Sequence, residues 1–269
     1  MQTEIIQNLL LGAVQGITEW LPISSSGIVI LLNANFFGVS DIGRLLHIAL
    51  FLHLGTFFAA LIYFRKDVAE LISALFKYKY SDDSSKKTLK FLIISTMISG
   101  VVGLIILKTL ISFESQFEIT GKIITGLVGV MLLFTGIIQI KIRGRGLKNP
   151  RSLKNTDGIL LGAVQGASTL PGISRSGITV SSLLLRNFDD TTALRLSFLM
   201  SLPIVLIGNL FLNLQDFFKV VNSTAIYGLL ASFIFGILTI HGLIKISRKI
   251  NFGWFALIFA LLMLGSLFI

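Results

Sequence analysis

The sequence predicts an all-α integral membrane protein built from two copies of one unit, and two observations lead to this prediction. Of the 269 residues, 54% are hydrophobic and only 13% are charged, whereas soluble domains carry about 25% charged residues. In addition, residues 11–28 and 161–178 align without a gap and are identical at 11 of 18 positions, which indicates an internal duplication. We therefore expect one membrane domain over 1–269, with repeat 1 at about 1–142 and repeat 2 at about 155–269.

Each copy of the duplicated segment is too interrupted to form one straight spanning helix. A helix needs roughly 20 apolar residues to cross a bilayer, and the apolar runs on either side of Pro22 are shorter. Pro22 disfavours helix at the residue before it, and the serines at 24–26 suit the start of a new helix. We therefore expect a re-entrant hairpin over 4–38, repeated over 158–187, in preference to one helix kinked at proline.

The rest of the chain predicts three spanning helices after each hairpin. The expected spans are residues 44–64, 91–111 and 120–140 in the first repeat, and about 193–213, 224–244 and 252–269 in the second. Residues 65–90 are expected to form a polar loop with an amphipathic piece around 68–76. An odd number of crossings separates the hairpins, so they enter from opposite faces. This is an inverted repeat with its site near the midplane.

Lysines and arginines set the expected orientation. The loops at 65–90, 141–158, 186–195 and 245–249 carry 18 of the 23 basic residues, and the opposite face carries four. The positive-inside rule makes the basic side cytoplasmic, so both termini and the site are expected to open on the outer side of a multi-pass cell-membrane protein. We attribute the net charge of +10 to the basic loops on the cytoplasmic side, which face anionic lipid headgroups, and we expect no nucleic-acid partner. The sequence leaves open whether the chain forms a homodimer.

The two copies differ in charge at their polar centre, where Glu19 aligns with Thr169 and Ser25 aligns with Arg175. A charged residue inside a membrane is costly and marks a functional site by default. Arginine matches phosphate bidentately, and a helix start offers free N–H groups to an anion. We therefore predict a phosphate or diphosphate site with Glu19, Ser25 and Arg175 as its catalytic residues. The expected substrate-binding residues are Gln15, Ser24, Ser26, Ser174, Ser176 and Thr179.

Three roles stay open for Glu19: general base, ligand of a divalent cation, or structural partner of Arg175. The three histidines are interpreted first as packing or interface residues, although His53, in Leu-His-Leu-Gly, is the one to follow. No organic cofactor is expected. Because the chain has no cysteine, disulfides and thiolate metal sites are excluded.

These motifs resemble those of the undecaprenyl-diphosphate phosphatase family, the bacitracin-resistance membrane phosphatases. The family's (Glu/Gln)-x-x-x-Glu motif is similar to Gln15-Gly-Ile-Thr-Glu19, and its Pro-Gly-x-Ser-Arg-Ser-x-x-Thr motif matches residues 171–179 in full. The resemblance covers the whole chain and implies the same inverted repeat with a polyprenyl diphosphate as lipid partner. It also implies hydrolysis of the terminal phosphate, helped by Mg²⁺ or Ca²⁺, to recycle the lipid carrier of cell-wall synthesis; if such an ion is used, Glu19 is its expected ligand.

One position departs from the family pattern. Many members have a histidine just after the serines, in Ser-(Ser/Thr)-Gly-His, and at that position this chain has Ile28, which matches Ile178 in the second copy. We therefore expect water or Ser25 to be the nucleophile. The departure leaves two other interpretations open: a transporter or flippase for a lipid phosphate or small anion, because inverted repeats with broken helices are transporter architecture, and an inactive relative that only binds the lipid diphosphate.

Overall fold

The computed structural model describes residues 2–21, 23–37, 42–114, 126, 129–131, 133–134, 136–138, 140, 146–170, 173–213, 224–246 and 253–265. Within these residues the regular structure is helical, apart from one isolated bridge between Lys148 and Phe188. The α-helices are α1 (Gln2–Thr18), α2 (Ser25–Phe36), α3 (Ile42–Tyr63), α4 (Arg65–Phe76), α5 (Asp83–Glu114), α7 (Asn155–Ala167), α8 (Arg175–Leu185), α9 (Asp190–Asn213), α11 (Ala225–Ile246) and α12 (Gly253–Gly265). Two 3₁₀ turns, η1 (Tyr78–Tyr80) and η2 (Pro150–Ser152), complete the described elements.

Three of the described helices, α5, α9 and α11, are long and apolar enough to cross a membrane. A fourth span is formed if α3 and α4 count as one, although the chain bends by 82° between them. Four of the six expected spans therefore coincide with α3, α5, α9 and α11, which confirms an all-helical chain with several membrane-length helices. Most of the expected span at 120–140 lies outside the described residues, and α12 covers only part of the expected span at 252–269.

The segment at 65–90 is more helical than the predicted polar loop. α4 includes the amphipathic piece expected around 68–76, and α5 begins already at Asp83. Asp82 explains the early start, because its carboxylate accepts the N–H groups of Ser84 (2.9 Å) and Ser85 (3.2 Å) and so caps the helix. Hydrogen bonds from Ser85, led by its hydroxyl, hold the pKa of Asp82 below its usual value.

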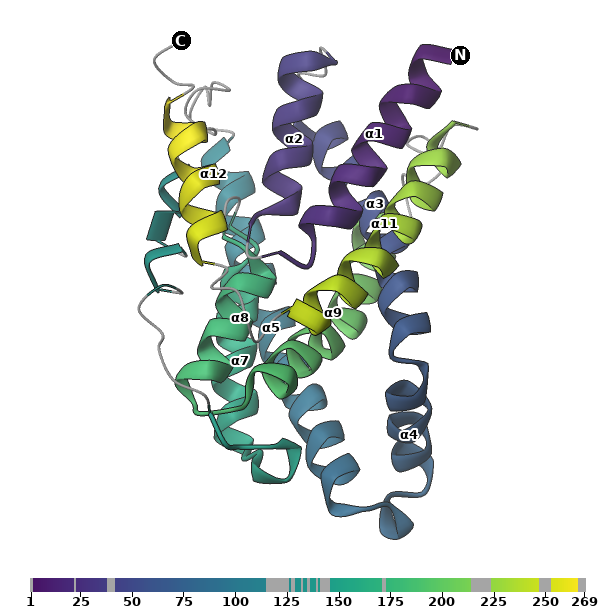
Figure 1. Ribbon diagram of the computed structural model, residues 1–269, viewed down its shortest axis with the longest axis vertical. Coiled ribbons are helices and arrows are strands. Elements are labelled where there is room, and N and C mark those ends of the chain that lie inside the picture. Colours follow the sequence, from purple (N-terminus) through teal and green to yellow (C-terminus); the bar gives the residue numbers. More distant parts are fainter. Residues whose placement is uncertain are drawn as a thin grey trace.

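Both duplicated segments reverse direction at the break. α1 and α2 pack against each other and run in opposite directions (Figure 1). In the second copy, Asp157 near the start of α7 pairs with Arg186 just after α8, with Oδ1 and Nη2 2.7 Å apart, a contact that requires α7 and α8 to be antiparallel. We call the turns between α1 and α2 and between α7 and α8 the tips of the two hairpins. The two tips are in contact, because the hydroxyls of Ser174 and Ser176 donate to the carbonyl of Leu21 at 3.3 and 2.6 Å.

Glycines let the first helix of each hairpin approach a long helix closely. On α1, Gly12 and Gly16 lie against α11, where a Cβ added at Gly12 would come within 2.0 Å of the carbonyl oxygen of Gly228. The duplicated glycines on α7, Gly162 and Gly166, lie against α5 in the same way. Each hairpin therefore packs against a long helix from the other half of the chain.

Candidate functional site

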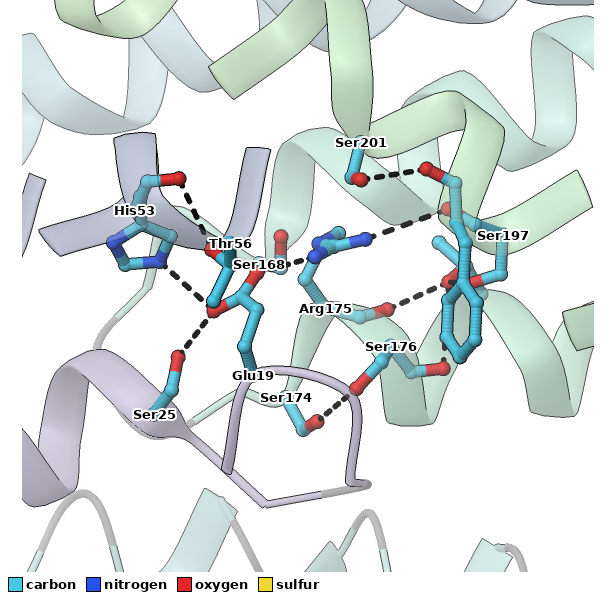
Figure 2. A network of polar contacts seen from close by, with 12 residues as sticks. Glu19, Ser25, His53, Thr56, Ser168, Ser174, Arg175, Ser176, Ser197 and Ser201 are labelled. Carbon is cyan, nitrogen blue, oxygen red and sulfur yellow. Dashed lines mark hydrogen bonds and ion pairs between the residues drawn. The ribbon is translucent and has the colours of Figure 1, made fainter. Parts of the chain in front are cut away.

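Glu19, in the turn after α1, is the centre of the polar network and has only 6% of its surface exposed. Its Oε1 forms an ion pair with Nη2 of Arg175, the first residue of α8. Its Oε2 accepts hydrogen bonds from Nε2 of Gln15 (2.9 Å) and Oγ of Ser25 (2.6 Å) and lies 3.0 Å from Nε2 of His53. Figure 2 shows the carboxylate between His53 and Arg175, with Ser25 beside it. Four helices thus converge on one carboxylate.

The guanidinium of Arg175 is held on several sides. Besides its ion pair with Glu19, it donates from Nη1 to the carbonyl of Ser197 at 3.4 Å and lies 5.7 Å from the centre of the Trp20 ring. Trp20 is fixed in turn by an edge-on contact with Phe198, with 4.7 Å between the ring centres. Because a guanidinium is planar, it can stack on a ring and donate in its own plane at once. The site therefore holds a permanent cation in a defined orientation.

The serines of the two tips have different tasks. Ser24 and Ser174 cap α2 and α8, because each hydroxyl accepts the N–H of the glycine three residues further on, at 3.3 and 3.1 Å. Ser176 joins the tips through its bond to the Leu21 carbonyl. Ser26 is half-buried, and its hydroxyl makes no hydrogen bond to another described residue. Of the six serines and threonines predicted for the site, Ser25 is the one bonded to Glu19.

Thr179 lies one turn behind Arg175 on α8 and is fully buried. Its hydroxyl lies 2.7 Å from the carbonyl of Arg175, to which it donates, and 2.6 Å from Oγ of Ser197. The structure therefore shows Thr179 joining α8 to α9, behind the tip rather than beside Glu19. A role for its hydroxyl in binding substrate stays a prediction.

Three contributors to the network were not among the predicted site residues. From the sequence, His53 is interpreted first as a packing or interface residue, whereas in the structure its Nε2 lies 3.0 Å from Oε2 of Glu19. Trp20 directly follows Glu19, and this adjacency was the available signal. Ser197 lies in the apolar run of α9 and has no sequence signal, because its role depends on how α9 packs against α8.

Two buried polar atoms at this centre have no hydrogen-bond partner among the described residues: Oε1 of Gln15 and Nε1 of Trp20. Buried polar groups are normally paired, so an unpaired acceptor and donor here indicate a site that takes a polar ligand or water. The helix starts at Ser25 and Arg175 add N–H groups without intrahelical acceptors. The arrangement can therefore bind an anion while Glu19 accepts a proton.

Glu19 can bind Mg²⁺ or Ca²⁺, as predicted, only if one of its carboxylate oxygens is free of other partners. Both ions take several oxygen ligands, but both Glu19 oxygens already contact donors or cations. Within the described residues, no group of three or more His, Cys, Asp or Glu side chains could hold a metal. The described residues do not form a protein cage for a divalent cation, and the metal stays a prediction.

Long apolar helices and a buried charged centre between two helix reversals define a multi-pass membrane protein with a polar site inside its helices. The chain belongs to the family described as bacitracin resistance protein BacA, which matches residues 8–265. It is 40% identical to an undecaprenyl-diphosphatase of Methanococcoides burtonii over 265 residues, which covers 97% of each chain. It is 35% identical to one of Haloarcula marismortui over 252 residues, 92% of each chain, and 33% identical to one of Christiangramia forsetii over 264 residues, 94% of each chain.

Proposed function

We propose that this protein hydrolyses undecaprenyl diphosphate to undecaprenyl phosphate and inorganic phosphate, and so recycles a lipid carrier for envelope polymer synthesis. Relatives named undecaprenyl-diphosphatase match it over nearly its whole length. The observation that carries the proposal is the meeting of Arg175 and Glu19 between two helix starts. This pair puts a cation suited to phosphate beside a carboxylate that can accept a proton.

The architecture that we propose for this site is an inverted repeat of two re-entrant hairpins, each followed by three spans. Its support is an exchange of partners between the halves: α1 packs on α11, and its duplicate α7 packs on α5. The glycines of these two contacts occupy matching positions in the duplicated segment. A two-fold relation between halves of opposite orientation gives this pattern and brings the tips together near the midplane.

We further propose that the site opens to the outside of the cell membrane. α1 begins and α12 ends at one end of the helices, whereas the α4–α5 connection and the start of α7 lie at the other end (Figure 1). The second end carries the basic segments at 65–90 and 146–158. The positive-inside rule makes that end cytoplasmic, so the termini and the mouth of the first hairpin face outward.

We propose that, when substrate binds, its diphosphate replaces the Glu19 carboxylate as the anion paired with Arg175. The lipid tail lies among the apolar helices, and the diphosphate reaches the tips, where the guanidinium leaves Glu19 for phosphate oxygens. N–H groups at the starts of α2 and α8 donate to the same oxygens, helped by the helix dipoles. Glu19 then has less positive charge beside it and becomes a better proton acceptor.

The chemistry proposed for Glu19 is general base catalysis. Oγ of Ser25 already donates to Oε2 of Glu19 at 2.6 Å, and either this hydroxyl or a water molecule gives its proton to the carboxylate while its oxygen attacks the terminal phosphorus. The bond from that phosphorus to the bridging oxygen breaks, and the lipid phosphate leaves with the electron pair. Arg175 stabilises the charge on the phosphoryl oxygens. If Ser25 attacks, a phosphoserine forms, and water hydrolyses it in a second step.

A divalent cation and a second copy of the chain remain separate proposals. Because Glu19 is fully engaged, we propose that Mg²⁺ or Ca²⁺, where it takes part, is held mainly by the phosphates of the substrate. The mass of the detergent-solubilised protein measures whether a homodimer forms.

The test is phosphate release from undecaprenyl diphosphate by the purified protein in detergent, beside Glu19→Ala and Arg175→Ala. Glu70→Ala and Arg151→Ala, which change exposed residues of the same types, are the controls. Release by wild type and the controls, but not by the two site variants, supports the hydrolase. No release by folded wild type, with or without Mg²⁺ and Ca²⁺, overturns it. Movement of a lipid phosphate or phosphate in reconstituted vesicles would then favour the transporter.

A further inference from the structure

Both ring nitrogens of His53 face acceptors. Nδ1 lies 2.6 Å from the carbonyl oxygen of Ala49, one turn earlier on α3, and Nε2 lies 3.0 Å from Oε2 of Glu19. A carbonyl oxygen and an ionised carboxylate can only accept, and a neutral imidazole has a single N–H. Both contacts are hydrogen bonds only if the ring carries hydrogen on both nitrogens. A neutral ring would turn a lone pair toward one of its two neighbours.

The ring and its carboxylate partner are enclosed by protein. The side chains of His53 and Glu19 are 15% and 4% exposed. α3 is held at this level by α11, because Oγ of Ser232 donates to the carbonyl of Leu52 at 2.8 Å. Among the described residues that pack around the ring, the charged groups acting on it are Glu19 and Arg175. The charge on the ring therefore acts directly on the catalytic carboxylate.

We propose that His53 is a positioning residue for Glu19 and that its ring must be charged for hydrolysis to proceed, an inference that rests on the proposed function. When Arg175 moves to the substrate phosphates, the His53 ring is the cation that stays beside Glu19. Its Nε2–H then holds Oε2 in place next to Ser25. Once the ring loses that proton, its lone pair repels the carboxylate, and Glu19 turns away from Ser25.

Ile28, two residues after Ser26, does not supply this function. Ile28 is apolar and packs with Ile23 and Ala260. It carries no hydrogen to donate to Glu19 through its side chain. The imidazole at the site therefore comes from a different helix, α3, whose position relative to the tips is fixed by tertiary packing.

The test compares phosphate release as a function of pH for wild type, His53→Gln and His53→Leu. The amide of glutamine can donate to Glu19 but does not titrate, whereas leucine can do neither. We expect wild type to lose activity on the alkaline side and His53→Gln to stay active without that alkaline fall. His53→Leu should lower kcat by about 10- to 100-fold, the range for loss of one hydrogen bond to a charged group. His241→Gln is the matched control, because this exposed histidine lies near the far end of α11.

The outcomes separate this inference from the proposed function. An active His53→Gln variant with the wild-type alkaline fall overturns the role of His53 and leaves the hydrolase intact. An inactive wild type overturns the proposed hydrolase function. The protonation state of the His53 ring is then measured directly by ¹⁵N NMR of histidine-labelled protein. The spectrum of His53→Gln identifies the His53 signal among those of the three histidines. We expect both ring nitrogens to be protonated at neutral pH, and one to lose its proton in Glu19→Gln. A neutral ring in wild type overturns the inference whatever the enzyme assay gives.

Discussion

The carboxylate of Glu19 and the guanidinium of Arg175 form an ion pair although they are 156 positions apart in the sequence. Both side chains are largely buried, with 4% and 13% of their surface exposed. Each belongs to the tip of a different hairpin, so the pair connects the two copies of the duplicated unit. Because moving either charge out of water costs several kcal/mol, each residue depends on the other in the absence of substrate.

We expect the loss of one of these charges to destabilise the protein more than the loss of both. Glu19→Gln leaves Arg175 buried without its counter-charge, which should lower the free energy of unfolding by about 3–5 kcal/mol. Arg175→Gln should cost less, since His53 remains beside Glu19. The double variant should recover most of the loss. Unfolding in detergent measures all four proteins, and strictly additive losses would contradict coupling between the two charges.

Metal content gives a second prediction from the same carboxylate. We expect the purified protein to hold substoichiometric Mg²⁺ and Ca²⁺ after dialysis without a diphosphate, because both Glu19 oxygens are already engaged. Elemental analysis of wild type and Glu19→Gln measures this. Stoichiometric metal in wild type that disappears in the variant would show instead that Glu19 exchanges its partners for a resident cation.

The duplication is what made the centre of the site predictable from sequence. Two interrupted apolar segments predicted two helix reversals, and a lone carboxylate and a lone guanidinium at the two breaks predicted a shared site. Ser25 aligns with Arg175 and was predicted with it. The structure brings Glu19, Ser25, Gln15 and Arg175 together, since opposite charges in an apolar setting have few other partners.

The parts that the sequence missed depend on packing between helices. His53 is one histidine in an apolar helix, and the pattern alone does not say which side of α3 meets the tips. Ser197 and Thr179 share a hydrogen bond only because α8 packs against α9. The early start of α5 was missed for a different reason: the polar residues after Asp82 favour a loop by composition, while its cap on Ser84 and Ser85 extends the helix beyond the apolar run.

The close contact of α1 with α11 predicts a size limit at Gly12. In Gly12→Ala the new Cβ would lie 2.0 Å from the carbonyl oxygen of Gly228, so the helices must separate, and overpacking of this kind costs about 1–3 kcal/mol. Gly100→Ala is the matched control, because a Cβ there meets no atom within 4 Å among the described residues. Thermal unfolding should show a loss only for Gly12→Ala, and equal effects of both changes would contradict the close contact.

The second hairpin has an ionic clamp at its mouth. Oδ1 of Asp157 accepts from Nε of Arg186 at 2.8 Å, and Oδ2 accepts the N–H of Lys154 at 2.8 Å. The matching positions of the first copy are Gln7 and Phe36, which cannot form such a pair.

Asp157→Asn should therefore lower the free energy of unfolding by about 1.5–3 kcal/mol, the usual worth of hydrogen bonds to a charged group. The control is Asp83→Asn, whose pair with Lys87 is a surface contact, the Asp83 side chain being 65% exposed. Such exposed pairs within one helix contribute only about 0.3–0.5 kcal/mol. If both variants unfold at the same point, the clamp contributes no more than a surface ion pair.

The indole N–H of Trp20 gives a prediction that separates ligand binding from folding. Its Nε1 is buried without a hydrogen-bond partner among the described residues, while its ring faces the Arg175 guanidinium and contacts Phe198 edge-on. Trp20→Phe keeps a six-membered ring in place but removes the indole N–H and part of a buried ring, so the free energy of unfolding should fall by about 1–3 kcal/mol. If a phosphate oxygen accepts this N–H, kcat/KM should fall by about 2- to 10-fold, the worth of one ordinary hydrogen bond.

The control is Trp254→Phe, which changes a tryptophan that is 58% exposed on α12. This variant should change neither the free energy of unfolding nor kcat/KM. A Trp20→Phe protein that keeps the wild-type kcat/KM would contradict a hydrogen bond from this N–H to the substrate.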